Sequence, residues 1–338
     1  MPISLSRRIF AQAAAAAAGL SAVPLIGARA ATYTLRLGCD ITEDHPIGSH
    51  LIAAAKSISK ATNGEIDIQV FLNNQLGDDT HMMAALRTGA IDIMAVGDNI
   101  LAEMVPSVAI DNIGFAFKDA SSAFDALDGE VGQIVRGDME KVGLHPMPRI
   151  WDEGFRQITT ATKPINSPQD LRGFKIRVPP SPIALSLFKD LGAAPLTLNG
   201  SQLYTALQTH LADGQENPLG TIETNKYYEV QKYCSLTNHM WVGYWVVANL
   251  ESWKRIPPQL QTAIEQGFDN EVAAQRQATE NLNESLIPKL EAQGLKFNRP
   301  DIATFRKALA EAGFYKDWQQ KFGTGLWKAL SKYSSSVA

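Results

Sequence analysis

The stretch YTLRLGCDITEDHPIGSHLIAAAKSISKATNGEIDIQVF, residues 33–71, contains the pattern that decides the fold class. Apolar residues alternate with others over 33–37 and again over 66–71, which is the two-residue period of a half-buried β-strand. Between these strands, residues 47–61 carry apolar side chains at helical spacing, and the Asn-Gly pair that follows is a typical helix end. A strand, a helix and a strand in this order predict a βαβ unit with parallel strands.

The same alternation of strands and helices continues along the chain. Pro179 and Pro180 stop the strand that ends at 178, and Pro288 is expected to kink or break a long helix. We therefore predict an α/β protein with a mainly parallel sheet that has helices on both faces. The further elements expected are helices over 80–88, 183–191, 203–211 and 258–293, strands over 91–96 and 174–178, and strand-like stretches over 148–151 and 243–249.

The N-terminus has the pattern of an export signal. Arg7 and Arg8 precede Phe10, an alanine-rich apolar run covers 13–26, and the run ends in Ala28-Arg29-Ala30. Basic residues, an apolar stretch and a small-residue cleavage site predict a secretory signal over 1–30, of the twin-arginine kind, cleaved after about Ala30. A membrane anchor is the alternative, but the run is shorter than the roughly 20 apolar residues of a spanning helix and contains a proline. We expect a periplasmic protein.

The charge balance excludes nucleic acid as a partner. The chain has 31 basic and 35 acidic residues, and residues 1–30 hold three of the arginines and no acid, so cleavage would leave 28 against 35, a net charge of −7. Nucleic-acid binding needs clustered Lys and Arg, which an acidic chain lacks. The 308 residues that would remain exceed what one hydrophobic core usually supports, and two lobes are expected.

Residue types that mark metal or catalytic sites are sparse. Cys39 and Cys234 lie far apart, belong to no metal-ligand spacing and are expected to be free thiols. The six histidines form no paired motif, and no G-x-S-x-G sequence is present. We predict no metal and no cofactor. A periplasmic enzyme acting on a carboxylate remains the alternative class, because active sites assemble from distant residues.

Three motifs in the middle of the chain carry a family resemblance. GFRQ at 154–157, KPI at 163–165 and DLRGFKIRVP at 170–179 resemble the solute-binding proteins of TRAP transporters, the tripartite ATP-independent periplasmic systems that include dicarboxylate and sialic-acid binders. The resemblance covers essentially all of the chain after the signal. Further matching stretches are QLG at 75–77, GAID at 89–92, YTALQ at 204–208, DGQENP at 213–218 and TNH at 237–239.

The resemblance implies an architecture and a transport role. It implies two α/β lobes, a hinge of crossing strands, and a long helix lying along both lobes. We place one lobe at 31–153 plus 243–282 and the other at 154–242 plus 283–338. The protein is then expected to be a monomer that is no enzyme. It would capture a small organic carboxylate and deliver it to the membrane permease subunits.

Arg177 is the residue expected to hold the ligand. In the family, the arginine of the K-x-R-V-P strand forms a paired salt bridge with the ligand carboxylate, and Arg177 stands at that position. A guanidinium presents a planar fork that matches a carboxylate with two hydrogen bonds. From residue chemistry alone, a solvated arginine at a strand end is an equal alternative.

Two further residues are expected beside Arg177. Arg156 matches a second family arginine that reaches the ligand, although it could instead pair with Asp152 or Glu153. Asn217 matches an asparagine that hydrogen-bonds the carboxylate region, since an amide donates without adding charge. The alternative for Asn217 is a turn residue ahead of Pro218.

Two aspartates are expected at the far end of the ligand. Asp40 follows the first strand, where family members present a polar contact, and Asp79 is similarly placed before a helix. A ligand carboxylate would be repelled by both, so they should face away from it. The alternatives are solvation in a loop for Asp40 and helix N-capping for Asp79.

Aromatic residues near the hinge indicate the kind of ligand. Trp151, Trp241 and Tyr244 could form an aromatic cleft, which favours an aryl 2-oxo or 2-hydroxy acid bound by stacking. Aromatic residues on strands are more often core. A sugar acid, either a hexuronate or an aldonate, is the alternative ligand. Sialic acid is disfavoured as the ligand, because sialic-acid binders carry a glutamate at about the position of Gly97 and a phenylalanine near the position of Gly200, where this chain has glycines.

Overall fold

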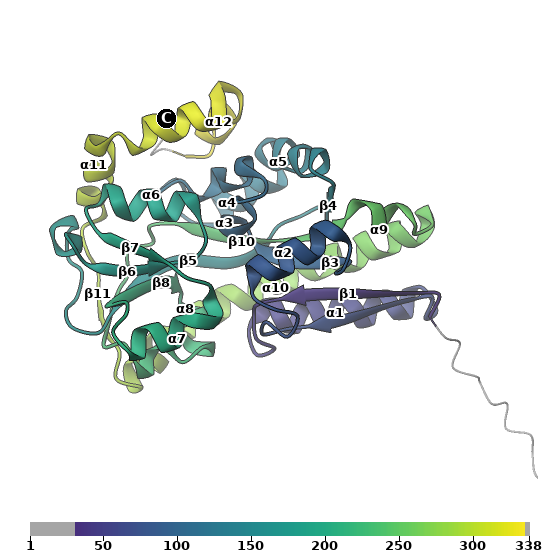
Figure 1. Ribbon diagram of the computed structural model, residues 1–338, viewed down its shortest axis with the longest axis horizontal. Coiled ribbons are helices and arrows are strands. Elements are labelled where there is room, and N and C mark those ends of the chain that lie inside the picture. Colours follow the sequence, from purple (N-terminus) through teal and green to yellow (C-terminus); the bar gives the residue numbers. More distant parts are fainter. Residues whose placement is uncertain (1–30, 335–338) are drawn as a thin grey trace, which may run out of the picture. The chain divides into compact units, whose positions relative to one another are not determined.

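The computed structural model describes residues 31–334, and the predicted export signal over 1–30 lies outside them. The first elements follow the expected βαβαβ order, and β1 pairs in parallel with both β2 and β3 (Figure 1). Parallel strands with crossover helices are what the residue pattern requires. These elements are β1 (Tyr33–Cys39), α1 (Pro46–Ala61), β2 (Ile66–Phe71), α2 (Asp79–Thr88) and β3 (Ile93–Gly97).

Two long strands connect this unit to the rest of the sheet. The strand order is β2-β1-β3-β10-β5-β8-β6-β7, where β10 (Trp241–Asn249) and β5 (Trp151–Thr160) are antiparallel neighbours. A register shift between Val242 and Gly243 interrupts their pairing, and Gly154 opposite has a φ of +111°, which favours glycine. The chain therefore passes between the two halves of the sheet at an irregular point.

The second half of the sheet repeats the α/β arrangement. Strand β6 (Lys175–Val178) pairs in parallel with β7 (Ala194–Thr197) and with β8 (Gly214–Pro218), and β8 is antiparallel to β5. Prolines stop β6 as expected, and Pro182 begins the next helix, where a missing N–H costs nothing. The helices of this half are α6 (Pro182–Asp190), α7 (Gly200–Gln208) and α8 (Leu219–Thr224).

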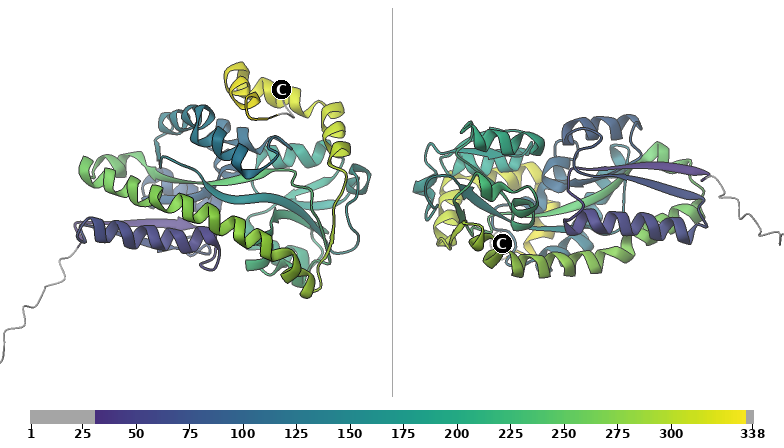
Figure 2. Two further views of the ribbon diagram at one scale, coloured as in Figure 1. Left: turned by 180° about the vertical axis from the view of Figure 1, so that it is seen from behind. Right: turned by 90° about the horizontal axis from the view of Figure 1, so that it is seen from below.

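The long helix expected from the sequence is α10 (Pro258–Ala292), and it continues through Pro288 rather than breaking there. It contacts α1, which belongs to the first half of the fold, and α8, which belongs to the second half. Figure 2 shows it beside α1. The remaining elements are α3 (Asp98–Leu101), η1 (Pro106–Asn112), α4 (Ala120–Asp128), α5 (Glu130–Lys141), β4 (Leu144–Pro146), η2 (Pro168–Leu171), η3 (Tyr227–Glu229), β9 (Tyr233–Ser235), α9 (Leu250–Lys254), β11 (Lys296–Asn298), α11 (Ile302–Ala312) and α12 (Phe314–Ser331).

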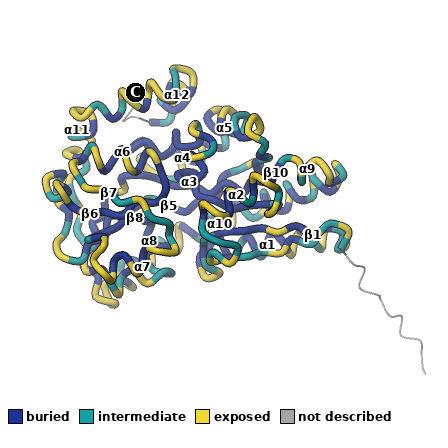
Figure 3. The backbone as a smooth tube through the Cα atoms, viewed as in Figure 1, coloured by how far each residue is buried: buried dark blue, intermediate teal, exposed yellow. Residues whose placement is uncertain are grey.

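Three hydrophobic clusters form the core, and buried positions follow the strands whereas exposed ones gather on the outer helices (Figure 3). Cys39 and Cys234 are both buried and unlinked, as predicted. No helix within residues 31–334 combines the length and the apolarity that crossing a bilayer requires. The mixed α/β fold class is thus confirmed, while the lobe boundaries at 153/154, 242/243 and 282/283 stay a prediction.

Candidate ligand-binding cavity

A polar cavity of about 280 Å³ lies where strands of both halves of the sheet end. Six of the eight predicted site residues line it: Asp40, Asp79, Arg156, Arg177, Asn217 and Tyr244. Its volume is close to the lower end of the range of about 300–1,000 Å³ for ligand pockets, which suits a small molecule. The other residues along its wall are Ile41, Asn73, Asn74, Asn99, Ile100, Glu153, Pro179, Gly200, Ser201, Tyr204, Thr221, Asn225 and Tyr227.

The cavity is placed by strand ends. Asp40 directly follows β1, Asn99 follows β3 by two residues, and Pro179 directly follows β6. The carboxyl ends of neighbouring parallel strands meet at one edge of a sheet, and open α/β sheets place their ligand crevices there. Residues far apart in the sequence are brought together for this reason.

Arg177 is buried, with 3% of its surface exposed, and so it is not the solvated strand-end arginine of the alternative interpretation. Its Nε and Nη2 both donate to the backbone oxygen of Leu198, at 2.9 and 2.6 Å. Within residues 31–334, no carboxylate forms an ion pair with it, and its Nη1 has no hydrogen-bond partner. Burial lowers the pKa of Arg177 from its ordinary value, because a cation is less stable away from water. The guanidinium is held from one side and faces the cavity with the other.

Arg156 is paired inside the protein, chiefly with a residue that the sequence did not single out. Its Nε lies 2.5 Å from Oε2 of Glu216, and its Nη2 lies 3.0 Å from Oε1 of the same carboxylate. Glu153 is farther, at 3.5 Å from Nη1. Asp152, the other expected partner, instead accepts from the indole of Trp241 at 2.9 Å.

Glu216 is a buried carboxylate that stays ionised. Burial is the largest single effect and opposes its charge, but the positive charge of Arg156 and the hydrogen bonds from His239 and Arg156 together outweigh it and lower the pKa of Glu216 to about 2. His239 adds a further contact from Nε2 to Oε2 of Glu216 at 3.1 Å, and its Nδ1 lies 2.8 Å from the hydroxyl of Thr237. The charge of Arg156 is therefore compensated within the protein, whereas that of Arg177 is not compensated by a paired carboxylate.

Asn217 lies in strand β8, and the turn suggested by Pro218 does not form there. Its Oδ1 accepts from Nη2 of Arg156 at 2.9 Å, and its Nδ2 donates to Oε1 of Gln215 at 2.5 Å. Both ends of the amide are thus engaged by protein, although Nδ2 carries a second hydrogen that these bonds leave over. The residue holds Arg156 in place beside the cavity.

Asp40, Asp79 and Glu153 form an acidic wall. Asp40 accepts from the hydroxyl of Tyr244 at 2.9 Å, and Glu153 accepts from the hydroxyl of Thr221 at 2.7 Å. Burial raises the pKa of all three carboxyl groups, that of Glu153 to about 7. A carboxyl group near that pKa can both donate and accept hydrogen bonds at neutral pH.

Asp79 does not cap helix α2, so that alternative was wrong. The N-cap is Asp78, whose Oδ1 accepts from the backbone N–H of His81 at 3.0 Å. Asp79 is the first residue of the helix itself, and its side chain is buried beside the cavity. Two consecutive aspartates made the choice ambiguous from the sequence.

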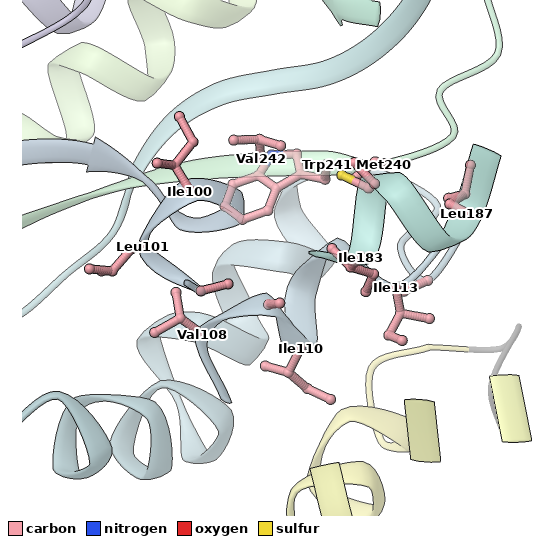
Figure 4. Packing of buried hydrophobic residues seen from close by; sticks show 14 of the residues in the cluster. Ile100, Leu101, Val108, Ile110, Ile113, Ile183, Leu187, Met240, Trp241 and Val242 are labelled. Atoms are coloured by element: carbon pink, nitrogen blue, oxygen red, sulfur yellow. The ribbon is translucent and has the colours of Figure 1, made fainter. Parts of the chain in front are cut away.

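Trp151 and Trp241 lie in the core and do not line the cavity. The ring of Trp241 packs edge-on against Phe117 and Phe124, and Figure 4 shows it among apolar side chains such as Ile100. Trp151 packs against Phe268 of α10. Their strand positions face the hydrophobic layer rather than the cavity. The aromatic residues on the cavity wall are tyrosines: Tyr204, Tyr227 and Tyr244.

The sequence analysis did not single out several residues that line the cavity, although the sequence contains a signal for some of them. Asn73 and Asn74 have positive φ angles of 51° and 60°, and an Asn-Asn pair shortly after a strand can indicate such a left-handed loop. Tyr204 and Asn225 stand in or next to short helices whose faces toward the cavity cannot be read from periodicity. Glu216 could have been suspected from its place in the matched DGQENP stretch.

Comparison with known proteins shows the family of the chain. The family model of the bacterial extracellular solute-binding protein, family 7 (DctP), matches residues 38–320. The chain is 30% identical over 309 residues to the 2,3-diketo-L-gulonate-binding periplasmic protein YiaO of Escherichia coli, covering 89% of this chain and 92% of that protein. It is 31% identical over 268 residues to the C4-dicarboxylate-binding periplasmic protein DctP of Rhodobacter capsulatus, covering 78% and 79%.

A solved structure shows the same fold. The sugar acid binding protein DctPAm from Advenella mimigardefordensis, in complex with galactonate, matches with a TM-score of 0.85 at 29% identity, covering 90% of this chain and 100% of that one. Fold and cavity define a solute-binding protein. The chain belongs to the bacterial extracellular solute-binding proteins of family 7, the periplasmic binding proteins of TRAP transporters. Proteins of this family bind small organic acids and work with membrane permease components.

Proposed function

We propose that this protein captures a small hydroxylated monocarboxylate, a sugar acid of the aldonate or hexuronate class, for a TRAP permease. The observation that carries the proposal is the charge arrangement of the cavity. Among the described residues, Arg177 is the only cation of the cavity that is not paired with a carboxylate. The wall that faces it consists of carboxyl and amide groups. One guanidinium binds one carboxylate, and the other groups bind hydroxyls.

The cavity wall favours a sugar acid over the aryl acid that the sequence favoured. The two tryptophans expected to stack on an aryl ring are packed in the core, and most of the lining side chains are polar. A hydroxylated chain can satisfy such a wall, whereas an aromatic ring would leave its buried polar groups without partners. Of the relatives, one is described as a 2,3-diketo-L-gulonate binder and one was solved with galactonate, which also supports a sugar acid.

Binding would begin when the ligand carboxylate meets the free side of Arg177. Residues from the other predicted lobe, such as Asp40 and Asp79, would then contact the far end of the ligand and favour a closed hinge. The hydroxyl of Thr80 already donates to Oδ1 of Asn199 at 3.3 Å, which joins the two predicted lobes at the edge of the cavity. A monomer, exported after cleavage near Ala30, would carry the ligand to the permease without changing it.

Replacing Arg177 by alanine tests the proposal. Calorimetry of the wild type with D-galactonate, D-glucuronate, mandelate and succinate should show binding of a sugar acid, and Arg177→Ala should weaken it at least 100-fold, because a charge-assisted paired contact is lost. Lys175→Ala, which removes an exposed cation from the same strand, is the matched control and should leave the affinity unchanged.

Three results would contradict the proposal. Unchanged affinity of Arg177→Ala for the bound acid would remove Arg177 from the site. Binding of mandelate and of none of the other acids would favour an aryl acid as the ligand. Chemical change of the bound acid, followed by mass spectrometry of the ligand after incubation, would favour the alternative class of a periplasmic enzyme.

A further inference from the structure

The side chain of His45 is buried where the two halves of the fold meet. It stands directly before helix α1, and only 1% of the residue is exposed. Ile47, two residues further on, belongs to the hydrophobic cluster of the first half. The ring faces Gly220 of α8, whose neighbour Leu219 belongs to the cluster of the second half. His45 therefore lies at a contact between the two predicted lobes, and it is not one of the residues that line the cavity.

Gly220 leaves room for this ring. A Cβ atom on Gly220 would lie 2.8 Å from Nε2 and 3.1 Å from Cδ2 of His45. Gly220 lies within helix α8 and has no positive φ angle, so its backbone conformation would accept other residues. The close approach of the imidazole from the other predicted lobe explains why a glycine stands there.

The hydrogen bonds of the ring require its neutral form. Nδ1 accepts from the backbone N–H of Ile47 at 3.2 Å and so caps α1, which places the one proton of the neutral ring on Nε2. Within residues 31–334, Nε2 has no hydrogen-bond partner. A second proton would have to lie on Nδ1, where it would point at the N–H of Ile47 and add positive charge to the N-terminal end of α1.

The surroundings offer a protonated ring little compensation. Burial lowers the pKa of His45 to about 4, although the charge of Asp44 acts in the opposite direction. On the elements across the contact, Glu223 of α8 is paired with Lys289 of α10 at 2.7 Å. Among the described residues, Asp44 is the only one whose charge acts appreciably on the ring. The contact with Gly220 is therefore compatible with a neutral His45 and opposed by a charged one.

We propose that His45 makes closure of the two predicted lobes sensitive to pH: its neutral ring packs against Gly220 in the closed form, and its protonation favours the open form, which releases the ligand. The inference rests on the proposed function, because it takes the lobes to close around a bound acid. Opening exposes the ring to water, so its pKa returns toward the ordinary value of about 6.5 and the open form binds the extra proton. Affinity for the acid is then full above about pH 7 and falls as the pH drops from there toward 4.

The test is the ratio of the dissociation constants at pH 5.0 and pH 7.5, measured by calorimetry with D-galactonate, D-glucuronate, mandelate and succinate. For the acid that binds, the ratio should be about 10-fold larger in the wild type than in His45→Asn. Asparagine cannot titrate, and its side-chain oxygen can still cap α1. The carboxyl groups of the cavity titrate in both proteins, so the comparison isolates His45.

His210→Asn is the matched control. His210 is exposed and has a φ of +58°, a conformation that asparagine tolerates, so this variant should keep the wild-type ratio. Gly220→Ala tests the contact from its other side. The added Cβ atom should weaken binding at pH 7.5 about 10-fold and lower the ratio as His45→Asn does, because the ring can no longer pack there.

An unchanged ratio in His45→Asn, with a wild-type melting temperature at pH 7.5, would overturn the inference and leave the proposed function in place. Wild-type affinity and ratio in Gly220→Ala would overturn it as well. Binding of mandelate or succinate alone would overturn the sugar acid as the ligand, while the same ratios measured with that acid decide the role of His45. Binding of none of the four acids would overturn both proposals.

Discussion

Glu216 and Asp269 show how the surroundings of an ion pair decide what the pair contributes. Glu216 and its partner Arg156 are both almost fully buried, whereas Asp269 and its partner Arg149 keep 34% and 35% of their side-chain surfaces exposed. Removing one member of a buried pair leaves an uncompensated charge away from water, which an exposed pair does not.

Glu216→Gln is therefore expected to lower the free energy of unfolding by about 3–5 kcal/mol. Asp269→Asn, at the exposed pair, is expected to lower it by about 1 kcal/mol or less. Urea unfolding followed by circular dichroism measures both. Equal losses for the two variants would contradict the assignment of Glu216 as the counter-charge of a buried arginine.

At this scale the sequence predicted the residues that stand in family motifs and missed those defined by packing. Arg177, Arg156 and Asn217 were singled out because the motifs are long, and all three line the cavity, while their contact with a ligand stays a prediction. The partner of Arg156 was missed because the antiparallel pairing of β5 with β8, which brings Glu216 beside it, is not visible in either strand alone. Trp151 was misplaced because a strand residue gives no sign of which face of the sheet is polar.

Among the elements, helix α10 packs closely against α1 at one glycine. A Cβ atom on Gly267 would lie 2.1 Å from Cγ1 of Ile58, which is fully buried and cannot move aside. In α5, by contrast, a Cβ atom on Gly137 would meet no atom within 4 Å. Replacing glycine by alanine should therefore have opposite effects on stability in the two helices.

We expect Gly267→Ala to destabilise the protein by about 1–3 kcal/mol, because overpacking a core contact forces the helices apart. Gly137→Ala should stabilise it by about 0.5–1 kcal/mol, because alanine restricts the unfolded chain and favours helix. Thermal unfolding of both variants compares them directly. A Gly267→Ala variant as stable as Gly137→Ala would show that α1 and α10 pack less closely than described.

Local patterns predicted most elements of the first half and were weakest where both faces of a strand are buried. The strand over 66–71 was predicted with its observed bounds, since one of its faces is solvated and its residues alternate. Strand β5 was recognised only at its start, because Asp152, Glu153 and Arg156 are polar and buried within it. Such residues resemble a loop until their buried partners are known.

Across the whole molecule, buried carboxyl groups link stability to pH. Burial raises the pKa of Asp152 to about 7, although the indole of Trp241 and the charge of Arg276 lower it. The folded state therefore keeps a proton that the unfolded state releases near pH 4. The contribution of this group to the free energy of unfolding is complete below pH 4 and falls as the pH rises to about 7.

Asp152→Asn removes that dependence while its side-chain oxygen can still accept from Trp241. Relative to the wild type, the variant should gain on the order of a few kcal/mol of unfolding free energy between pH 4 and pH 8. Urea unfolding at both pH values provides the comparison. A difference between variant and wild type that is the same at both pH values would contradict a raised pKa for Asp152.

The arrangement of the whole sheet was the least accessible to local patterns. The sequence indicated parallel βαβ units, but the insertion of β10 and β5 as antiparallel neighbours in the middle of the sheet depends on contacts between residues about 90 positions apart. The crossing strands were expected only from the family resemblance.

The positions of the tryptophans have a spectroscopic consequence. All six lie within residues 31–334 and none lines the cavity, whereas Trp151, Trp241 and Trp245 lie in the two connecting strands β5 and β10. A sugar acid has no chromophore, and within this cavity it would touch none of these indoles. A change of tryptophan emission on addition of ligand would therefore report rearrangement of the connecting strands, and it offers an intrinsic optical test of the proposed closure.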